Sequence, residues 1–163
     1  MASRKHFLPY APLAHSDDGV REYVRAYLIP RTQVTVAEVG GRIMGLLALK
    51  RDDGLGSVEQ LYLHPDAVGQ GIGAALIEQA KADLGPPIRL FTFQQNTGAR
   101  RFYERHGFVA IELTDGADNE EHCPDVLYEW RGEMGVSSAG TSWVSEFGWD
   151  RCRFGASAND YLV

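Results

Sequence analysis

Glycines near the middle of the chain have the type and spacing of a phosphate-binding turn. Gly69, Gly71 and Gly73 alternate with other residues immediately before an apolar pattern of helical period. The first amides of a helix are free and the helix dipole is positive there, so phosphate groups bind at this position. Glycine leaves the backbone bare, which allows a phosphate to approach the amides closely. On this motif alone, a phosphate site and an ordinary glycine-rich turn both stay open.

Two nucleotide-binding patterns can be tested on this segment. Residues 69–74 satisfy the dinucleotide pattern G-x-G-x-x-G/A, in which the first glycine follows a strand directly and an acidic residue ends the next strand. Here residues 65–68 separate the strand from the glycines, and the next strand runs into Gln94-Gln95-Asn96 without a carboxylate. No Gly-Lys-Ser/Thr follows, which excludes a Walker A loop. A dinucleotide or nucleoside triphosphate site is therefore disfavoured.

The strand and loop around the glycines resemble the acetyl-CoA motif of the GCN5-related N-acetyltransferase (GNAT) family. Leu61-Tyr62-Leu63-His64-Pro65 precedes the turn, and Gly71 and Gly73 match the last two fixed positions of (Arg/Gln)-x-x-Gly-x-(Gly/Ala). Val68 stands at the Arg/Gln position, which is a departure from the family. The resemblance implies that acetyl-CoA binds as co-substrate, with its pyrophosphate on the amides of residues 69–74. The implied cofactor residues here are Leu61, Leu63, Val68, Gly69, Gln70, Gly71, Ile72, Gly73 and Ala74.

A second segment, downstream, resembles the same family. Asn96, Ala99, Phe102-Tyr103-Glu104 and Gly107-Phe108 follow the family pattern Asn-x-x-Ala-x-x-Phe-Tyr-Glu-x-x-Gly-Phe. The resemblance covers roughly residues 16–132 and implies the GNAT fold. This is an α+β fold of three layers, with a mostly antiparallel twisted sheet that splays at the acetyl-CoA site and is flanked by helices. The family's N-terminal strand and first helix are expected to be shortened or absent.

The resemblance also implies catalytic roles. Tyr103 matches the family tyrosine beside the CoA sulfur and would act as general acid, since a phenol stays protonated at neutral pH. Glu59, in the strand before the loop, would be the general base, directly or through water, and a solvent-facing strand residue is its alternative interpretation. Gln60 and His64 are lesser candidates, and a turn role is the simpler reading of His64.

Three more residues complete the implied cofactor site. Asn96 would orient the pantetheine arm, and it can also serve as the N-cap of the following helix. Ala99 and Phe102 belong to the same family segment and are expected beside it. The implied reaction transfers an acetyl group to a primary amine by direct attack through a tetrahedral intermediate, so Cys123 is not needed as a nucleophile.

The acceptor and the activity itself are less defined by the sequence. The resemblance implies a small-molecule or peptide amine, and the carboxylates of Asn119-Glu120-Glu121 could receive a cation or simply form a solvated loop. The alternative function is a catalytically silent acyl-CoA-binding or sensor module on the same fold. The departure at Val68 and the short N-terminus leave that alternative open.

The elements that position these residues can be predicted from hydrophobic period and turn chemistry. Ser16-Asp17-Asp18 predicts a helix start and Pro30 its end, and Gly40-Gly41 predicts a hairpin turn. Strands are expected at 34–39, 43–49, 58–63, 88–93, 108–113 and 126–130, and helices at 72–84 and 97–106. One face of the first helix is expected to be buried through Val20, Tyr23, Val24, Tyr27 and Leu28.

Composition limits the function classes. The 163 residues fit one domain, with 16 Lys plus Arg against 22 Asp plus Glu and a net charge of −6. An acidic protein of this kind is a poor non-specific nucleic-acid binder and favours the approach of cationic substrates. Neither Cys123 nor Cys152 has metal-ligand spacing, so no metal site is expected. The absence of a signal-peptide or membrane-spanning pattern predicts a cytoplasmic protein.

The two ends of the chain differ from the rest. Residues 1–15 are expected to be irregular, residues 16–132 to form the acetyltransferase domain, and residues 133–163 to be a tail outside the catalytic core. The tail shows neither helical nor strand period, yet it contains Trp143, Phe147, Trp149, Phe154 and Tyr161. Exposed aromatic area is unfavourable in water. We therefore expect the tail to dock on the domain or on a second copy, which leaves a homodimer open.

Overall fold

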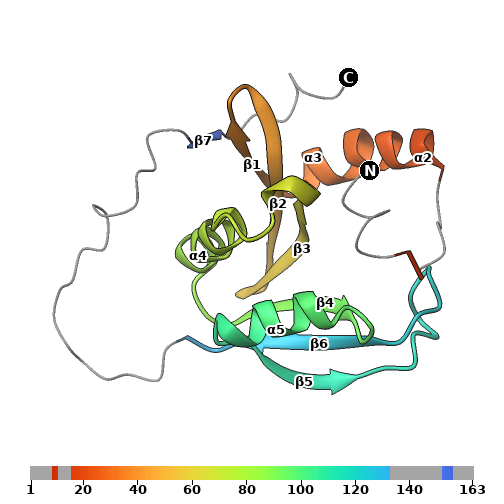
Figure 1. The fold of residues 1–163 in the computed structure, drawn as a ribbon. Helices are drawn as coiled ribbons and strands as arrows, with labels where there is room; N and C mark the ends of the chain where they lie inside the picture. The colour runs from red at the N-terminus through yellow and green to blue at the C-terminus, as the bar shows by residue number, and fades with distance from the viewer. Residues whose placement is uncertain (1–8, 11–15, 133–151, 156–163) are drawn as a thin grey trace, which may run out of the picture.

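The computed structural model describes residues 9–10, 16–132 and the backbone of 152–155. In this part of the chain the strands form one sheet in the order β5-β6-β4-β3-β2-β1-β7. The fold is α+β, as the sequence predicts, and Figure 1 shows its elements. The strands are β1 (Gln33–Val39), β2 (Arg42–Asp52), β3 (Leu55–Leu63), β4 (Ile88–Phe93), β5 (Val109–Leu113), β6 (Asp125–Trp130) and β7 (Cys152–Gly155). The helices are α2 (Asp17–Tyr23), a π-helical segment (Val24–Leu28), α3 (Ile29–Arg31), a 3-10 turn (Pro65–Ala67), α4 (Ile72–Leu84) and α5 (Thr97–Arg105).

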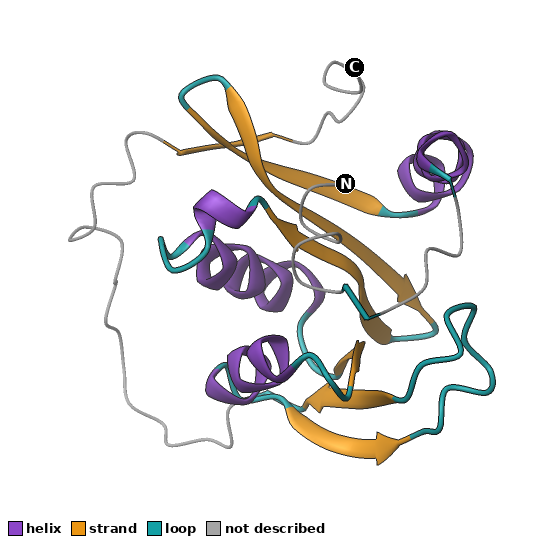
Figure 2. Cartoon of the chain, turned by 45° about the vertical axis from the view of Figure 1, so that its right-hand side comes forward, coloured by secondary structure: helices purple, strands orange, loops and turns teal. Residues whose placement is uncertain are grey.

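Helices cover both faces of the sheet. Figures 1 and 2 show α4 on one side of β1–β3 and the α2–α3 segment on the other. Alternate residues of β2 point to opposite faces, and Leu47 joins the core under α4 while Ala48 joins a second cluster with Leu28 and Val34. The sheet is therefore the middle layer of three, which agrees with the predicted architecture.

The sheet opens between β3 and β4. Its other described pairs are antiparallel, but β3 and β4 run parallel and pair only at Gly56 with Ile88 and at Ser57 with Arg89. Beyond Ser57 the two strands separate, and the rest of β3 has a partner on one side only, β2. This is the splay that the resemblance implies.

The main core holds the two halves of the sheet together. Its fully buried side chains include Leu47, Leu76, Ile77, Ile88 and Tyr128, which come from β2, α4, β4 and β6. The helix α4 lies over the point where β3 and β4 separate and packs against β2 and β3. Burial of apolar area contributes a free energy of about 25 cal/mol per Å², and this stabilises the opened sheet.

The first helix differs from the prediction in two ways. Ser16 caps it as expected, with its Oγ accepting from the Gly19 N–H at 3.1 Å. The helical segment continues through Pro30 to Arg31, because Pro30 lies in the first turn of α3, where proline is tolerated. Of the five apolar residues expected to be buried, only Leu28 is, and Tyr23 is 38% exposed.

That helix is exposed because the described part of the chain buries no residue of α2. Its buried contacts are made by its last turns, where Leu28 meets β1 and β2. The expectation of an irregular stretch at residues 1–15 lies outside the described residues, apart from a turn at Pro9 and Tyr10.

Part of the C-terminal segment extends the sheet. The strand β7 pairs antiparallel with β1 and so forms the edge beyond it. The sequence pattern indicated no strand there, because four residues are too few to show a period. The rest of 133–163, with Trp143, Phe147, Trp149 and Tyr161, lies outside the described residues. The boundary predicted near residue 132 stays a prediction. In the described part of the chain no helix has the length and apolar character needed to cross a membrane.

The loop between β5 and β6 folds tightly on itself. Asn119 donates to the Cys123 carbonyl and to Asp125, and Thr114 donates to Asp125 at 2.6 Å. Gly116 is buried with φ +80°, and a Cβ there would lie 2.3 Å from the backbone of Cys123. The loop is therefore a defined wall, which requires glycine at position 116.

We predict that Gly116→Ala destabilises the protein more than Gly54→Ala. The φ angle is +84° at Gly54 and +80° at Gly116. Both substitutions therefore introduce left-handed backbone strain of about 1–2 kcal/mol. A Cβ at Gly54 would meet no atom within 4 Å, whereas a Cβ at Gly116 would overlap the Cys123 backbone. Urea unfolding of both variants measures the difference. Equal losses of stability would show that the loop yields to the added atom.

Candidate active site

A cavity of about 1050 Å³ occupies the opening between β3 and β4. Six consecutive residues of β3, 58–63, line it. Neighbouring residues of a strand point to opposite faces, so the cavity reaches both faces of the sheet through the gap. Its walls also include the turn before α4, the cavity-facing part of α5, the end of β4 and the loop after β5. Two reactants can thus meet in it from opposite sides of the sheet.

The glycine-rich turn forms one end of this cavity. Gly69 and Gly71 have φ of +80° and +82°, and Gly71 is the N-cap of α4. No side chain caps this helix start, and a Cβ at either glycine would meet open space. Val68 lines the same end and is 50% exposed. Free helix amides beside an open cavity are an arrangement suited to an anion, and anion binding here stays a prediction.

Glycine is needed at position 73 for a reason other than the expected one. Its place in the motif predicts that Gly73 leaves the backbone bare beside a phosphate. In the structure Gly73 is buried, and a Cβ would lie 3.0 Å from the Leu63 side chain and 3.4 Å from the Phe102 ring. Glycine here allows α4 to pack closely against β3 and α5. Ile72 is also buried in the core, at 3% exposure, so only its backbone faces the turn.

The strand β3 presents an open edge to the cavity. The His64 N–H donates to the Met44 carbonyl of β2 at 2.8 Å. Backbone groups alternate along a strand, so the N–H groups of Leu63 and Leu61 point away from β2 and toward the gap. An extended ligand can pair with this edge as an added strand would.

Tyr103 lies deep in the cavity wall. Its side chain is on α5, is 8% exposed, and contacts Phe102, Phe108 and Tyr128 edge-on or tilted, with ring centroids 5.3–6.2 Å apart. Burial, reinforced by Tyr62, raises the pKa of Tyr103 well above its ordinary value. We find no hydrogen bond to its hydroxyl among the described residues. The hydroxyl is therefore a protonated donor, without a protein acceptor in that part of the chain, on the cavity wall.

The start of α5 is fixed by Asn96. Its Oδ1 accepts from the Ala99 N–H at 3.1 Å, which is the N-cap role foreseen as an alternative. The side-chain NH₂ group of Asn96 is not used by this cap, and Asn96 and Ala99 both line the cavity. The cap and a role in ligand binding are thus compatible.

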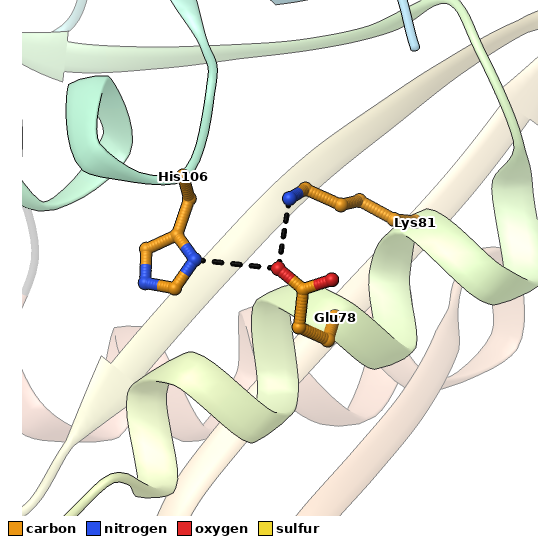
Figure 3. A network of polar contacts seen from close by, with 3 residues as sticks. All are labelled: Glu78, Lys81 and His106. Atoms are coloured by element: carbon orange, nitrogen blue, oxygen red, sulfur yellow. Dashed lines mark hydrogen bonds and ion pairs between the residues drawn. The ribbon is translucent and has the colours of Figure 1, made fainter. Parts of the chain in front are cut away.

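The far end of α5 is tied to α4 by a polar network (Figure 3). Glu78 of α4 accepts from Lys81 at 2.8 Å and lies 3.3 Å from the His106 Nδ1 atom. The His106 ring packs on Phe102, with centroids 4.6 Å apart, and both line the cavity. The network links the two helices that flank the glycine-rich end, although each exposed pair contributes little by itself.

Glu59 is half-buried on β3 and lines the cavity. Its Oε1 accepts from the Ser57 hydroxyl at 2.6 Å, which restrains the carboxylate. Gln60 also lines the cavity. His64 instead accepts from the Asp66 N–H at 3.2 Å, which is the contact of a turn residue.

The structure brings most of the predicted site together. Of the residues expected in the catalytic and cofactor site, all line the cavity except Gln70 and Ile72. Gln70 donates instead to the Asp66 carbonyl. Their binding and catalytic roles remain predictions.

Sequence reasoning missed the other end of the cavity. Phe91, Phe93, Glu112 and Asp118 line it together with the expected Glu121. Tyr10, from the N-terminal part, contacts Phe93 edge-on at 6.3 Å. These residues come from four separate segments, so no local pattern could assemble them. The exposure of Phe91 is visible only in the structure.

Comparison with known proteins identifies the family. Mycothiol acetyltransferase of Mycolicibacterium gilvum is 33% identical over 107 residues, 60% of this chain but only 35% of that protein. A peptidyl-lysine N-acetyltransferase of Escherichia coli is 26% identical over 66% of this chain and 69% of that protein. The structure of the PaiA N-acetyltransferase of Thermoplasma acidophilum, solved with coenzyme A, matches 80% of this chain and 87% of that one, with a TM-score of 0.61 and 19% identity. Residues 30–110 match the acetyltransferase (GNAT) domain model, and with the splayed sheet and the glycine turn this shows that the chain belongs to the GNAT family.

Proposed function

We propose that this chain is an acetyl-CoA-dependent N-acetyltransferase that acts on a primary amine. The observation that carries the proposal is the cavity that joins the uncapped start of α4 to the buried hydroxyl of Tyr103 through the gap in the sheet. The amine attacks the thioester carbonyl directly, forming a C–N bond as the C–S bond breaks. The amine loses one proton, and the departing CoA thiolate takes up one proton.

Each step has a group suited to it. The amides at the start of α4 would hold the pyrophosphate, and the open edge of β3 would pair with the pantetheine arm. An N–H group of Leu61 or Leu63 would stabilise the oxyanion of the tetrahedral intermediate. Glu59, restrained by Ser57, would accept the amine proton directly or through water, and Tyr103 would protonate the thiolate.

The relatives support the class of reaction but leave the acceptor open. One relative is named a mycothiol acetyltransferase and another a peptidyl-lysine N-acetyltransferase. We therefore propose a small-molecule or peptide amine as acceptor.

A catalytically silent acyl-CoA-binding module is the second candidate. The exposed Val68 in place of the family's Arg or Gln favours it, because one cationic or amide contact to phosphate is lost. Release of free CoA in the presence of a panel of primary amines separates the two candidates. We expect release above the amine-free rate. Stabilisation by CoA without such release for any amine would support the silent module.

We predict that Gly71→Val weakens acetyl-CoA binding by roughly tenfold or more, because several charge-assisted hydrogen bonds to phosphate would be blocked. Gly54→Val is the matched control, since it has nearly the same φ, +84° against +82°, and lies outside the cavity wall. Isothermal titration with acetyl-CoA measures both variants. Unchanged affinity in Gly71→Val would contradict the placement of the pyrophosphate.

We predict that Tyr103→Phe lowers kcat by roughly 10–100-fold while acetyl-CoA affinity stays nearly unchanged, because the proton is needed only as charge develops on sulfur. Since the pKa of Tyr103 is raised, the hydroxyl stays protonated to higher pH than a free tyrosine, and kcat should not fall near pH 9 on its account.

The control for this variant is Tyr128→Phe. It removes a buried hydroxyl that donates to Glu104 at 2.7 Å and is not part of the cavity wall. This variant should lose stability but keep kcat. If Tyr103→Phe turns over like the wild type, the ring is structural or water supplies the proton.

A further inference from the structure

Charge is divided unevenly along the cavity. Among the described residues that line it, the basic groups are Arg105 and His106, both at the α5 end that is tied to α4. The acidic groups are on β3, on β5, in the loop between β5 and β6 or at the start of β6. Figure 1 shows that this loop lies at the end away from α4. They are Glu59, Glu112, Asp118, Glu121 and Asp125. An anionic cofactor and a cationic acceptor would thus be attracted to different ends.

Two of these carboxylates are committed to other tasks. Asp125 is buried and accepts from Thr114 and Asn119, so it holds the loop together. Glu59 is bonded to Ser57 and is the proposed base. Glu112 and Asp118 are exposed carboxylates on the same wall and have no such task in the proposed reaction.

Two cations beside this part of the cavity already have partners. Lys50, which acts on Glu59 through its charge, is paired with Asp52. Arg100 donates to the Tyr128 hydroxyl and to the Gln94 carbonyl. No lysine or arginine among the described wall residues therefore neutralises the acidic end.

The space between the two ends favours an apolar chain. Phe91 is 61% exposed and lies with Phe93 on the cavity wall, from the strand that faces the opening. Exposed aromatic area of this kind is stabilised when an alkyl chain covers it. The Tyr103 hydroxyl, more than nine-tenths buried and without a hydrogen bond in the described residues, independently marks the wall as a place for a ligand.

From this arrangement we propose that the acceptor carries a second cationic group, which Glu112 and Asp118 receive while the reacting amine lies between Glu59 and Tyr103. The proposal rests on the proposed function, since it names the class of acceptor for the same site. The preferred substrates are diamines, polyamines or other molecules with two or more cationic groups separated by an apolar chain. The reaction neutralises one cationic group, so the monoacetylated product is held less strongly than the substrate.

The test compares 1,6-diaminohexane with hexylamine, which have the same chain and differ in one charge. Titration of each amine into the full chain saturated with CoA measures binding without turnover. We expect the diamine to bind roughly fivefold more tightly at low salt, as suits exposed charge pairs, and the advantage to shrink at about 0.5 M NaCl. During acetylation we expect a lower KM for the diamine than for hexylamine, and nearly equal kcat values for the two amines.

Variants then locate the second cation. Glu112→Gln combined with Asp118→Asn should remove the preference for the diamine and leave hexylamine binding nearly unchanged. Asp115→Asn is the control, because Asp115 is in the same loop but not on the cavity wall. It should keep the preference. Thermal unfolding checks that the variants are folded, and the comparison of the two amines on the wild type stands without them.

The outcomes separate this proposal from the proposed function. Equal affinity for both amines, or a preference that survives the double variant, overturns the proposal even if acetyl transfer occurs. Tighter binding of the diamine that the double variant abolishes supports the proposal, and it does so even if no acetyl group is transferred. In that last case the result contradicts the proposed acetyl transfer and not the proposed class of ligand.

Discussion

The site depends on the limited pairing of β3 with β4. Two paired positions join the strands, and beyond Ser57 they diverge. A strand that loses its neighbour leaves backbone N–H and C=O groups without partners, which is costly unless water or a ligand satisfies them. Here the gap exposes the open edge of β3 to the cavity and connects the two faces of the sheet. The antiparallel pairing of β4 with β6 and the core under α4 and α5 hold the opened halves in place.

Close packing and open space are placed side by side around that gap. Gly73 and Ile72 are buried, so α4 sits tightly on β3 and α5. Earlier in the same segment, Gly69 and Gly71 face open space with left-handed backbone. One glycine-rich segment therefore has two structural roles, close helix packing and exposure of backbone amides. The sequence pattern indicates only the second role. At the opposite end, Gly116 allows a loop folded closely enough to carry carboxylates on the cavity wall.

Local chemistry made several elements predictable. The N-caps Ser16 and Asn96, the hairpin at Gly40-Gly41 and the positive φ of Gly107 follow from side-chain acceptors and from the absence of a Cβ, and all are present. The burial of the first helix was not predictable in the same way. Its apolar period is real, but only Leu28 is fully buried against β1 and β2, with Val24 partly buried against the same cluster, and period alone does not say how far a neighbouring layer extends.

The sequence by itself determined the fold class, the order of the elements and the family, because these depend on period, turn residues and two motifs with fixed spacing. It also specified which residues line the cofactor end, since they lie within two short segments. Only the tertiary structure decided the other end. Glu112 lies on β5 and Asp118 in the loop after it, Phe91 and Phe93 belong to β4, and Tyr62 belongs to β3, so they meet only through the strand order of the sheet. Long-range strand pairing leaves no local signal, and for that reason the acceptor wall could not be seen in the sequence.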